Sequence, residues 1–196
     1  MTTPSEKPIR LFIAADPGEA VRAELIRLQG RLERQLAGTP FKIRWVGQEA
    51  MHLTFLFLGD QPAGRVGELL RTTEMAARKF PKFVMKLTTA GCFGRPNAPR
   101  VLWVGLDAPP ALFSLQAELA GTFEIKDNGL FHPHLTLGRV RAGRGPEVFH
   151  ALRELPVQPV PFELTSLELI RSELMPIGPR HTLLGTAPLA TSCSSA

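Results

Sequence analysis

Two short motifs carry the residue types best suited to chemistry in this chain. His52-Leu53-Thr54 and His134-Leu135-Thr136 repeat one pattern 82 positions apart in a sequence of 196 residues. Imidazole has an unperturbed pKa of about 6.5, so one histidine can accept a proton near neutral pH while another donates one. Threonine hydroxyls can donate hydrogen bonds to oxygens on which negative charge develops. Two such pairs across a cleft suit a phosphorus centre, and a cyclic phosphodiester would keep its leaving group tethered.

The sequence around the motifs predicts strands that present them. Residues 51–58 and 134–140 are apolar runs of strand length. Because side chains alternate along a strand, each histidine would share one face with its threonine, while the leucine between them points into the core. A half-buried histidine bonded to a neighbour would explain one such motif equally well. The repeat of the motif in the same strand context favours a site.

The remaining pattern alternates helices with strands. Asp16-Pro17-Gly18-Glu19 predicts a helix start with Asp16 as the N-cap, and the apolar spacing predicts a helix down to Gly38. The glycines and prolines of residues 91–99 predict a loop. Several links between strands are too short for parallel crossovers. We therefore expect an α+β fold with mostly antiparallel pairing.

Composition and charge bound the class of protein. The chain has 23 basic and 18 acidic residues, a net charge of +5 and 44% hydrophobic residues, which is typical of a globular domain. No apolar run approaches the roughly 20 residues that span a bilayer. Cys92 and Cys193 are too few for a disulfide framework or a four-ligand zinc site. We expect one domain over residues 1–189, a flexible tail over 190–196, a cytoplasmic location, no membrane attachment and a monomer.

The chain resembles the 2H phosphoesterases, in particular the RNA 2′,3′-cyclic phosphodiesterases historically called 2′-5′ RNA ligases. The resemblance runs from about residue 10 to residue 189 and is carried by both motifs together with the segments 10–14, 44–46, 52–59, 99–105, 133–139 and 169–174. It implies a bilobal fold with pseudo-twofold symmetry, in which mostly antiparallel sheets surround a central cleft and helices lie outside.

The resemblance also implies metal-independent opening of an RNA-terminal or nucleoside 2′,3′-cyclic phosphate to a 2′-phosphate, without a cofactor. His52 and His134 would be the catalytic acid and base, and Thr54 and Thr136 would bind the phosphate. Arg139 matches an arginine that often follows the second motif and would neutralise phosphate charge, although strict alternation puts it on the leucine side. The expected partners are RNA 3′ ends or cyclic nucleotides. Ligation of RNA ends through a 2′-5′ bond, or RNA-end binding without turnover, are the alternatives.

Three positions depart from the family pattern. Leu56 stands where relatives often have a basic residue, His132 where they often have arginine, and His181 where they often have tyrosine. His132, with His150 or His181, also suggests metal ligands. No carboxylate stands at ligand spacing around these histidines, so we expect no metal.

Four further residues are weighed for the same cleft. Trp45 and Trp103 could stack on a base, but both lie in apolar strand patterns, which favours core packing. Arg100 and Arg171 could line the groove or lie on the solvated surface. Glycine-rich phosphate loops and a serine nucleophile elbow are missing from the sequence, so we expect no intrinsic ATP site.

Overall fold

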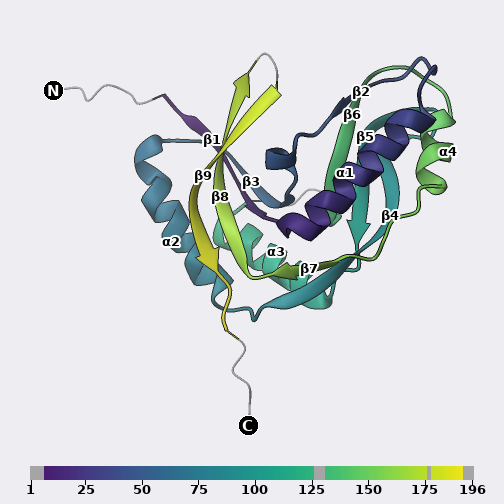
Figure 1. Ribbon diagram of the computed structural model, residues 1–196. Helices are drawn as coiled ribbons and strands as arrows, with labels where there is room; N and C mark the ends of the chain where they lie inside the picture. The colour runs from purple at the N-terminus through teal and green to yellow at the C-terminus, as the bar shows by residue number, and fades with distance from the viewer. Residues whose placement is uncertain (1–6, 126–130, 176–177, 192–196) are drawn as a thin grey trace, which may run out of the picture.

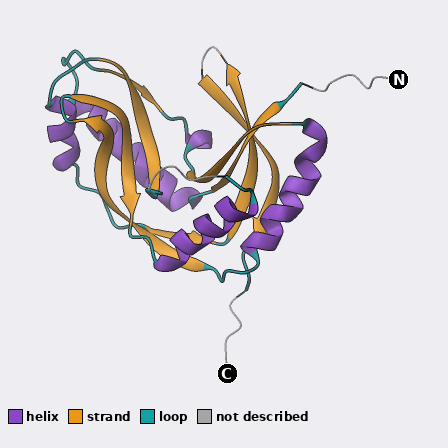
Figure 2. Ribbon diagram, turned by 180° about the vertical axis from the view of Figure 1, so that it is seen from behind, coloured by secondary structure: helices purple, strands orange, loops and turns teal. Residues whose placement is uncertain are grey.

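The computed structural model describes residues 7–125, 131–175 and 178–191. In this part of the chain nine strands form one curled sheet, and helices lie on its outer side (Figures 1 and 2). All pairings between named strands are antiparallel, which confirms the predicted α+β class. The strands are β1 (Ile9–Ala15), β2 (Lys42–Trp45), β3 (Leu53–Gln61), β4 (Phe83–Arg95), β5 (Ala98–Leu106), β6 (His134–Ala142), β7 (Pro161–Leu164), β8 (Ser166–Met175) and β9 (Gly178–Pro188).

Four α-helices and two short 3₁₀ turns connect these strands in the described residues. They are α1 (Gly18–Gln35), η1 (Gln48–Ala50), η2 (Ala63–Arg65), α2 (Val66–Ala77), α3 (Pro110–Thr122) and α4 (Glu147–Arg153). The described part contains no helix that is both long and apolar enough to cross a membrane.

The order of the strands is symmetric about the centre of the sheet. Along the sheet the order is β7-β4-β5-β6-β3-β1-β8-β9, with β2 added beside β6. Strands β6 and β3 meet in the middle and each begins at one His-x-Thr motif. Strands β5 and β1 flank them, and each leads into a helix of the opposite half. This arrangement is the expected pseudo-twofold relation between two lobes.

The helices are exchanged between the two halves of the sheet. Helix α1 follows β1 in one half but packs against β6 and β7 in the other, while α3 follows β5 and packs against β3. Leu25, Leu28 and Leu32 of α1 are fully buried in the main hydrophobic core, which lies between the sheet and its helices. Each half therefore supplies the cover for the strand that carries the other half's motif.

Two local predictions need correction. The predicted loop over residues 91–99 is wrong, because β4 continues to Arg95 and β5 begins at Ala98. Gly91 leaves room for the Trp103 ring, which a Cβ there would overlap, and Gly94 has a positive φ of +110° at an irregularity of the hairpin. These glycines serve close approach and a bulge rather than a loop.

The second correction concerns the start of α1. Pro17 occupies the N-cap, one residue beyond the predicted Asp16. The Asp16 carboxylate still accepts a hydrogen bond of 2.6 Å from the Gly18 N–H, so this side chain satisfies a free amide of the first turn.

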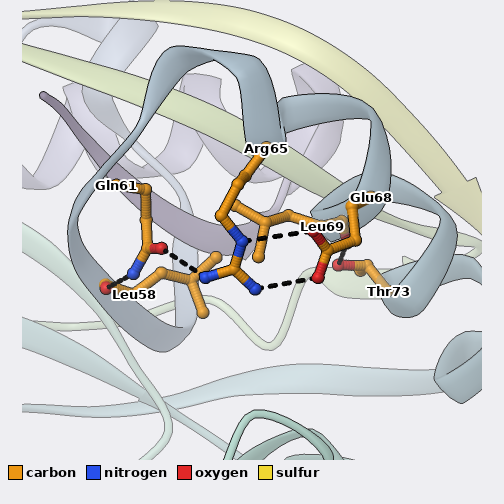
Figure 3. A network of polar contacts seen from close by, with 6 residues as sticks. All are labelled: Leu58, Gln61, Arg65, Glu68, Leu69 and Thr73. Atoms are coloured by element: carbon orange, nitrogen blue, oxygen red, sulfur yellow. Dashed lines mark hydrogen bonds and ion pairs between the residues drawn. The ribbon is translucent and has the colours of Figure 1, made fainter. Parts of the chain in front are cut away.

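The connection from β3 into α2 is held by a polar network (Figure 3). The Arg65 guanidinium pairs with the Glu68 carboxylate at 2.8 Å and donates to the Gln61 side-chain oxygen at 3.3 Å. The Gln61 amide in turn donates to the Leu58 carbonyl at 2.7 Å. The network fixes the turn that follows the first motif strand.

The C-terminal end of the described chain lies beside the segment that connects α2 to β4. The Ala190 N–H donates to the Phe80 carbonyl at 2.9 Å, and Leu189 is buried in the core. Residues 192–196, including Cys193, lie outside the described residues. The division into a domain over 1–189 and a tail over 190–196 stays a prediction.

The central pairing should carry a large share of the stability. Leu135 on β6 is fully buried, so Leu135→Ala should lower the free energy of unfolding by about 2–5 kcal/mol through lost apolar contacts and a residual cavity. Leu174→Ala is the matched control, because this side chain is 76% exposed and its loss should change stability by less than about 0.5 kcal/mol. Urea titration of both variants measures the difference. Equal midpoints would contradict the assignment of Leu135 to the core.

Candidate active site

The two His-x-Thr motifs meet where β3 and β6 pair. Leu53 lies directly opposite Leu135 in antiparallel register, and both leucines point into the main core. Because side chains alternate along each strand, the histidines and threonines on either side of these leucines project from the opposite face. In a regular antiparallel pair the residue before one leucine faces the residue after the other, so this register directs each histidine towards the threonine of the other motif.

We call this side of the sheet the motif face and define it by four residues: His52, Thr54, His134 and Thr136. A small separate cluster of Phe12, Ala14 and Ile170 lies on this face beneath the first motif. Ala14 pairs with Thr54 and Phe12 pairs with Ile170 across neighbouring strands. The motif face is therefore apolar in its base and polar at its centre.

Arg139 reaches the motif face through a β-bulge. On β5, Trp103 pairs with Thr136, whereas the preceding residue, Leu102, pairs with Gly138. Leu137 is therefore an extra residue on β6. The extra residue reverses the alternation of the strand. Val101, which shares the face of Trp103, is the partner of Arg139. The bulge thus overcomes the strict alternation that would have kept Arg139 on the leucine side.

The backbone of the bulge is satisfied by its surroundings. The Leu137 carbonyl accepts hydrogen bonds from the Val46 N–H at 3.0 Å and from the Gln29 side-chain amide at 2.8 Å. The same Gln29 amide donates to the Val46 carbonyl at 2.9 Å. Helix α1 therefore contributes a side chain that stabilises the irregular strand geometry behind Arg139.

His52 lies in a cluster of rings formed by three strands. Its ring centroid is 4.9 Å from that of Phe12 and 5.2 Å from that of His181, and the Phe12 and His181 rings meet edge to face at 5.1 Å. Burial lowers the pKa of His52 from 6.5 to about 4, and the positive charge that His181 can carry contributes to this lowered pKa. Arg139 and His134 act in the same direction, whereas Asp16 raises the pKa of His52.

The backbone before His52 is held by an arginine of α1. Arg22 pairs with the Asp16 carboxylate at 2.7 Å and donates to the carbonyls of Gln48 at 3.3 Å and Met51 at 3.4 Å. Met51 is buried in the core. The backbone that precedes His52 is thus held by the Arg22 hydrogen bond and by the buried Met51 side chain, which restricts the position of the imidazole.

His134 is oriented by the backbone of its own segment. Its Nδ1 lies 2.7 Å from the His132 carbonyl oxygen. A carbonyl can only accept, so Nδ1 must carry the proton, and Nε2 is the nitrogen left for proton exchange. Burial lowers the pKa of His134, and the hydrogen bond to His132 raises it in part. The Phe93 ring packs against His134 at right angles, with centroids 4.9 Å apart.

Trp103 belongs to the aromatic group around His134 rather than to the main core. Its ring lies 4.6 Å from His132 and 5.5 Å from Phe93. The Trp103 Nε1 is buried without a hydrogen-bond partner among the described residues. Trp45, by contrast, packs against the main core, as the sequence favours. The two tryptophans therefore have different surroundings despite similar strand patterns.

His181 was singled out from the sequence only as a departure from the family and as a metal-ligand candidate. It comes next to His52 because β9 pairs with β8, so that His181 faces Ser172. Its Nδ1 is buried without a hydrogen-bond partner among the described residues. The hairpin that joins β8 to β9 also approaches β2. Gly178 lies so close to the Arg44 guanidinium that a Cβ at this position would overlap it. No local spacing connects residue 181 with residue 52, so only the sheet order reveals the contact.

Other residues weighed from the sequence lie elsewhere. The metal-ligand candidates are separated, with His181 beside His52, His132 beside His134, and His150 on α4. In the described part of the chain, no three histidine, cysteine, aspartate or glutamate side chains gather as metal ligands would.

Arg171 and Arg100, the two arginines considered for the groove, also lie away from the motifs. Arg171 pairs with Glu173 at 2.8 Å and follows Leu169 on the core-facing side of β8. Arg100 is exposed and lies at a register shift of β5, near the hairpin that joins β4 to β5.

Comparison with known proteins places this architecture in a family. The profile of the LigT like phosphoesterases matches residues 16–103 and, a second time, residues 104–181. The chain belongs to this family of two-lobed phosphoesterases, which are part of the 2H superfamily. Each matched segment contains one His-x-Thr motif, and the double match confirms the resemblance found from the motifs.

Curated relatives match over most of their length. A Thermotoga maritima protein named RNA 2′,3′-cyclic phosphodiesterase is 30% identical over 90% of this chain and 93% of its own. A Thermus thermophilus protein with the same name is 32% identical over 90% of this chain and 88% of its own.

Solved structures share the fold. A crystal structure of a Thermus thermophilus protein has a TM-score of 0.78 at 28% identity, and covers 94% of this chain and all of its own. Escherichia coli LigT complexed with 3′-AMP has a TM-score of 0.69 at 26% identity, with 94% of this chain and all of its own covered.

The contact between His52 and His181 leads to a titration experiment. His181→Phe keeps a ring against Phe12 but removes the charge that opposes protonation of His52. The pKa of His52 should therefore rise from about 4 towards 6.5, remaining below it because burial is the larger cause. NMR titration of the His52 ring measures the shift. His150→Phe, on the distant helix α4, is the control and should leave the pKa of His52 unchanged. An unchanged pKa of His52 in His181→Phe would contradict the electrostatic contact.

Proposed function

We propose that this chain hydrolyses RNA-terminal or nucleoside 2′,3′-cyclic phosphates to 2′-phosphates, without a metal ion, at the motif face. The observation that carries the proposal is the pairing of Leu53 with Leu135, which turns both His-x-Thr motifs to the same side of the sheet. The names of the curated relatives support the activity. The nucleotide complex of Escherichia coli LigT supports a nucleotide-sized ligand for this fold.

In the proposed reaction the cyclic phosphate lies between the two imidazoles. One histidine takes a proton from a water molecule, whose oxygen forms a new bond to phosphorus. The other histidine gives a proton to the 3′-oxygen as the bond between phosphorus and this oxygen breaks. The 2′-ester bond is retained, so the product is a 2′-phosphate with a free 3′-hydroxyl.

The neighbouring side chains would stabilise the charge that builds on phosphorus. The hydroxyls of Thr54 and Thr136 would donate to the non-bridging oxygens, and the Arg139 guanidinium would offset their negative charge. His134 would act through Nε2, because its Nδ1–H is engaged by the His132 carbonyl. The reaction needs no cofactor, since proton transfer and charge stabilisation come from these side chains.

Removal of either imidazole tests the proposal directly. His52→Ala and His134→Ala should each lower kcat by about 10²–10⁴-fold, since each variant loses one proton-transfer group. Product analysis on a nucleoside 2′,3′-cyclic phosphate in excess chelator should show 2′-phosphate with the wild type. His150→Ala serves as the control histidine, because it lies on α4 away from both motifs.

The same assay separates the alternatives. Full turnover in the double variant, or loss of wild-type activity with chelator, would contradict the proposed chemistry. Adding RNA with a 5′-hydroxyl end tests for ligation, since a 2′-5′ junction would appear only if that hydroxyl replaces water as the nucleophile. Binding without any product would favour a non-catalytic RNA-end protein.

The lowered pKa values predict an acidic optimum for the free enzyme. The active form needs one protonated and one neutral imidazole, but burial lowers the pKa of His52 to about 4 and also lowers that of His134. The doubly neutral pair therefore takes over as the pH rises, and kcat/KM should follow a bell with its maximum below pH 6.5. The profile of kcat should lie at higher pH, because a bound phosphate anion favours the imidazolium. A kcat/KM that increases steadily above pH 6.5 would be the contrary result.

A further inference from the structure

A cavity at the end of the β4–β5 hairpin has no role in the proposed reaction. It is lined by Arg95, Asn97, Ala98, Arg144 and Gly145, and its volume is about 430 Å³. Since each water occupies roughly 30 Å³, the cavity has room for on the order of ten waters or for a phosphate group with its hydration. The Gly145 N–H donates to the Asn97 carbonyl at 3.0 Å, so the hairpin and the loop after β6 are joined at this point.

The charge of the cavity is not neutralised by the protein. Among the described residues, neither Arg95 nor Arg144 has an acidic partner within ion-pair distance, whereas Arg10, Arg22 and Arg65 on other surfaces are paired. The Glu147 carboxylate borders the lining, since it lies where a Cβ on Gly145 would stand. Among the ion pairs of the described residues, none joins Glu147 to either arginine of the cavity. Two exposed guanidinium groups of one lining that form no ion pair suit an external anion, and guanidinium matches phosphate geometry in particular.

The cavity and the second motif lie at different points along the same two paired strands, β5 and β6. Ala98, in its lining, lies five residues from Trp103 on β5, which corresponds to roughly 16 Å of strand. Arg100 on β5 and Arg141 on β6 lie in this interval, both exposed and both at register shifts of the sheet. Arg139 stands at the end nearest the motifs. Along β5 and β6, three arginines therefore stand between the second motif and the cavity.

We propose that the cavity formed by Arg95, Asn97 and Arg144 binds a backbone phosphate of an RNA strand whose 3′ end occupies the motif face. This inference rests on the proposed function and specifies its substrate as a polynucleotide end rather than a free cyclic nucleotide. A terminal 2′,3′-cyclic phosphate leaves the chain only one direction to extend, towards its 5′ end. Contacts from arginine to backbone phosphates add affinity without reading sequence, so the preference is for length and not for particular bases.

The test compares substrates of two lengths on matched variants. The substrates are a nucleoside 2′,3′-cyclic phosphate and a pentanucleotide RNA with the same terminal group. The wild type should favour the pentanucleotide in kcat/KM. Because each arginine would lose a charge-assisted contact to phosphate, the double variant Arg95→Ala/Arg144→Ala should lower the ratio of the two kcat/KM values by about tenfold or more. Its kcat/KM for the pentanucleotide should also depend less steeply on salt, by roughly 0.7 in the logarithmic slope for each lost phosphate contact.

The control removes the same charge from another surface. Arg71→Ala/Arg78→Ala deletes two exposed arginines of the α2 region, on the helix side of the sheet, and should leave the length ratio as in the wild type. An equal loss in this control, or a wild-type kcat/KM that is independent of length, would overturn the phosphate site alone. Failure of the wild type to open the mononucleotide would instead overturn the proposed function. The two hypotheses can therefore fail separately.

Discussion

The candidate site depends on a single antiparallel contact, in which one leucine from each half of the chain pairs at the centre of the sheet. Leu53 and Leu135 are buried on the helix side of the sheet. Because side chains alternate along a strand, the histidine and the threonine on either side of each leucine project from the other face, so both motifs share that face. A shift of one residue in this register would bury the polar side chains and expose the leucines, so the packing of the core and the assembly of the site are the same event.

Irregularities of the strands place the positive charge. The bulge at Leu137 turns Arg139 onto the motif face, and further register shifts occur beside Arg100 and Arg141. The Gln29 amide of α1 satisfies the backbone at the first of these points. Since α1 belongs to the half that carries His52, the exchange of helices between the halves ties the positioning of one motif to the folding of the other.

Burial gives the site its electrostatic character. Burial lowers the pKa of both imidazoles in the free protein, and an anion between them would raise it again. The charge needed for catalysis would then be created by the substrate itself. His181, packed against His52, adds a third imidazole to this balance.

The sequence by itself determined the class of fold and the identity of the two motifs, because these follow from local spacing and from residue chemistry. It predicted the first amphipathic helix, from an Asp16 N-cap down to Gly38, which the structure shortens to Gly18–Gln35. It also predicted that each histidine shares a face with its threonine. The tertiary structure alone decided that His181 lies against His52, that Arg139 turns to the motif face and that residues 91–99 form a hairpin. Sheet order, bulges and glycine packing arise from contacts between distant segments, and strict alternation along one strand does not contain them.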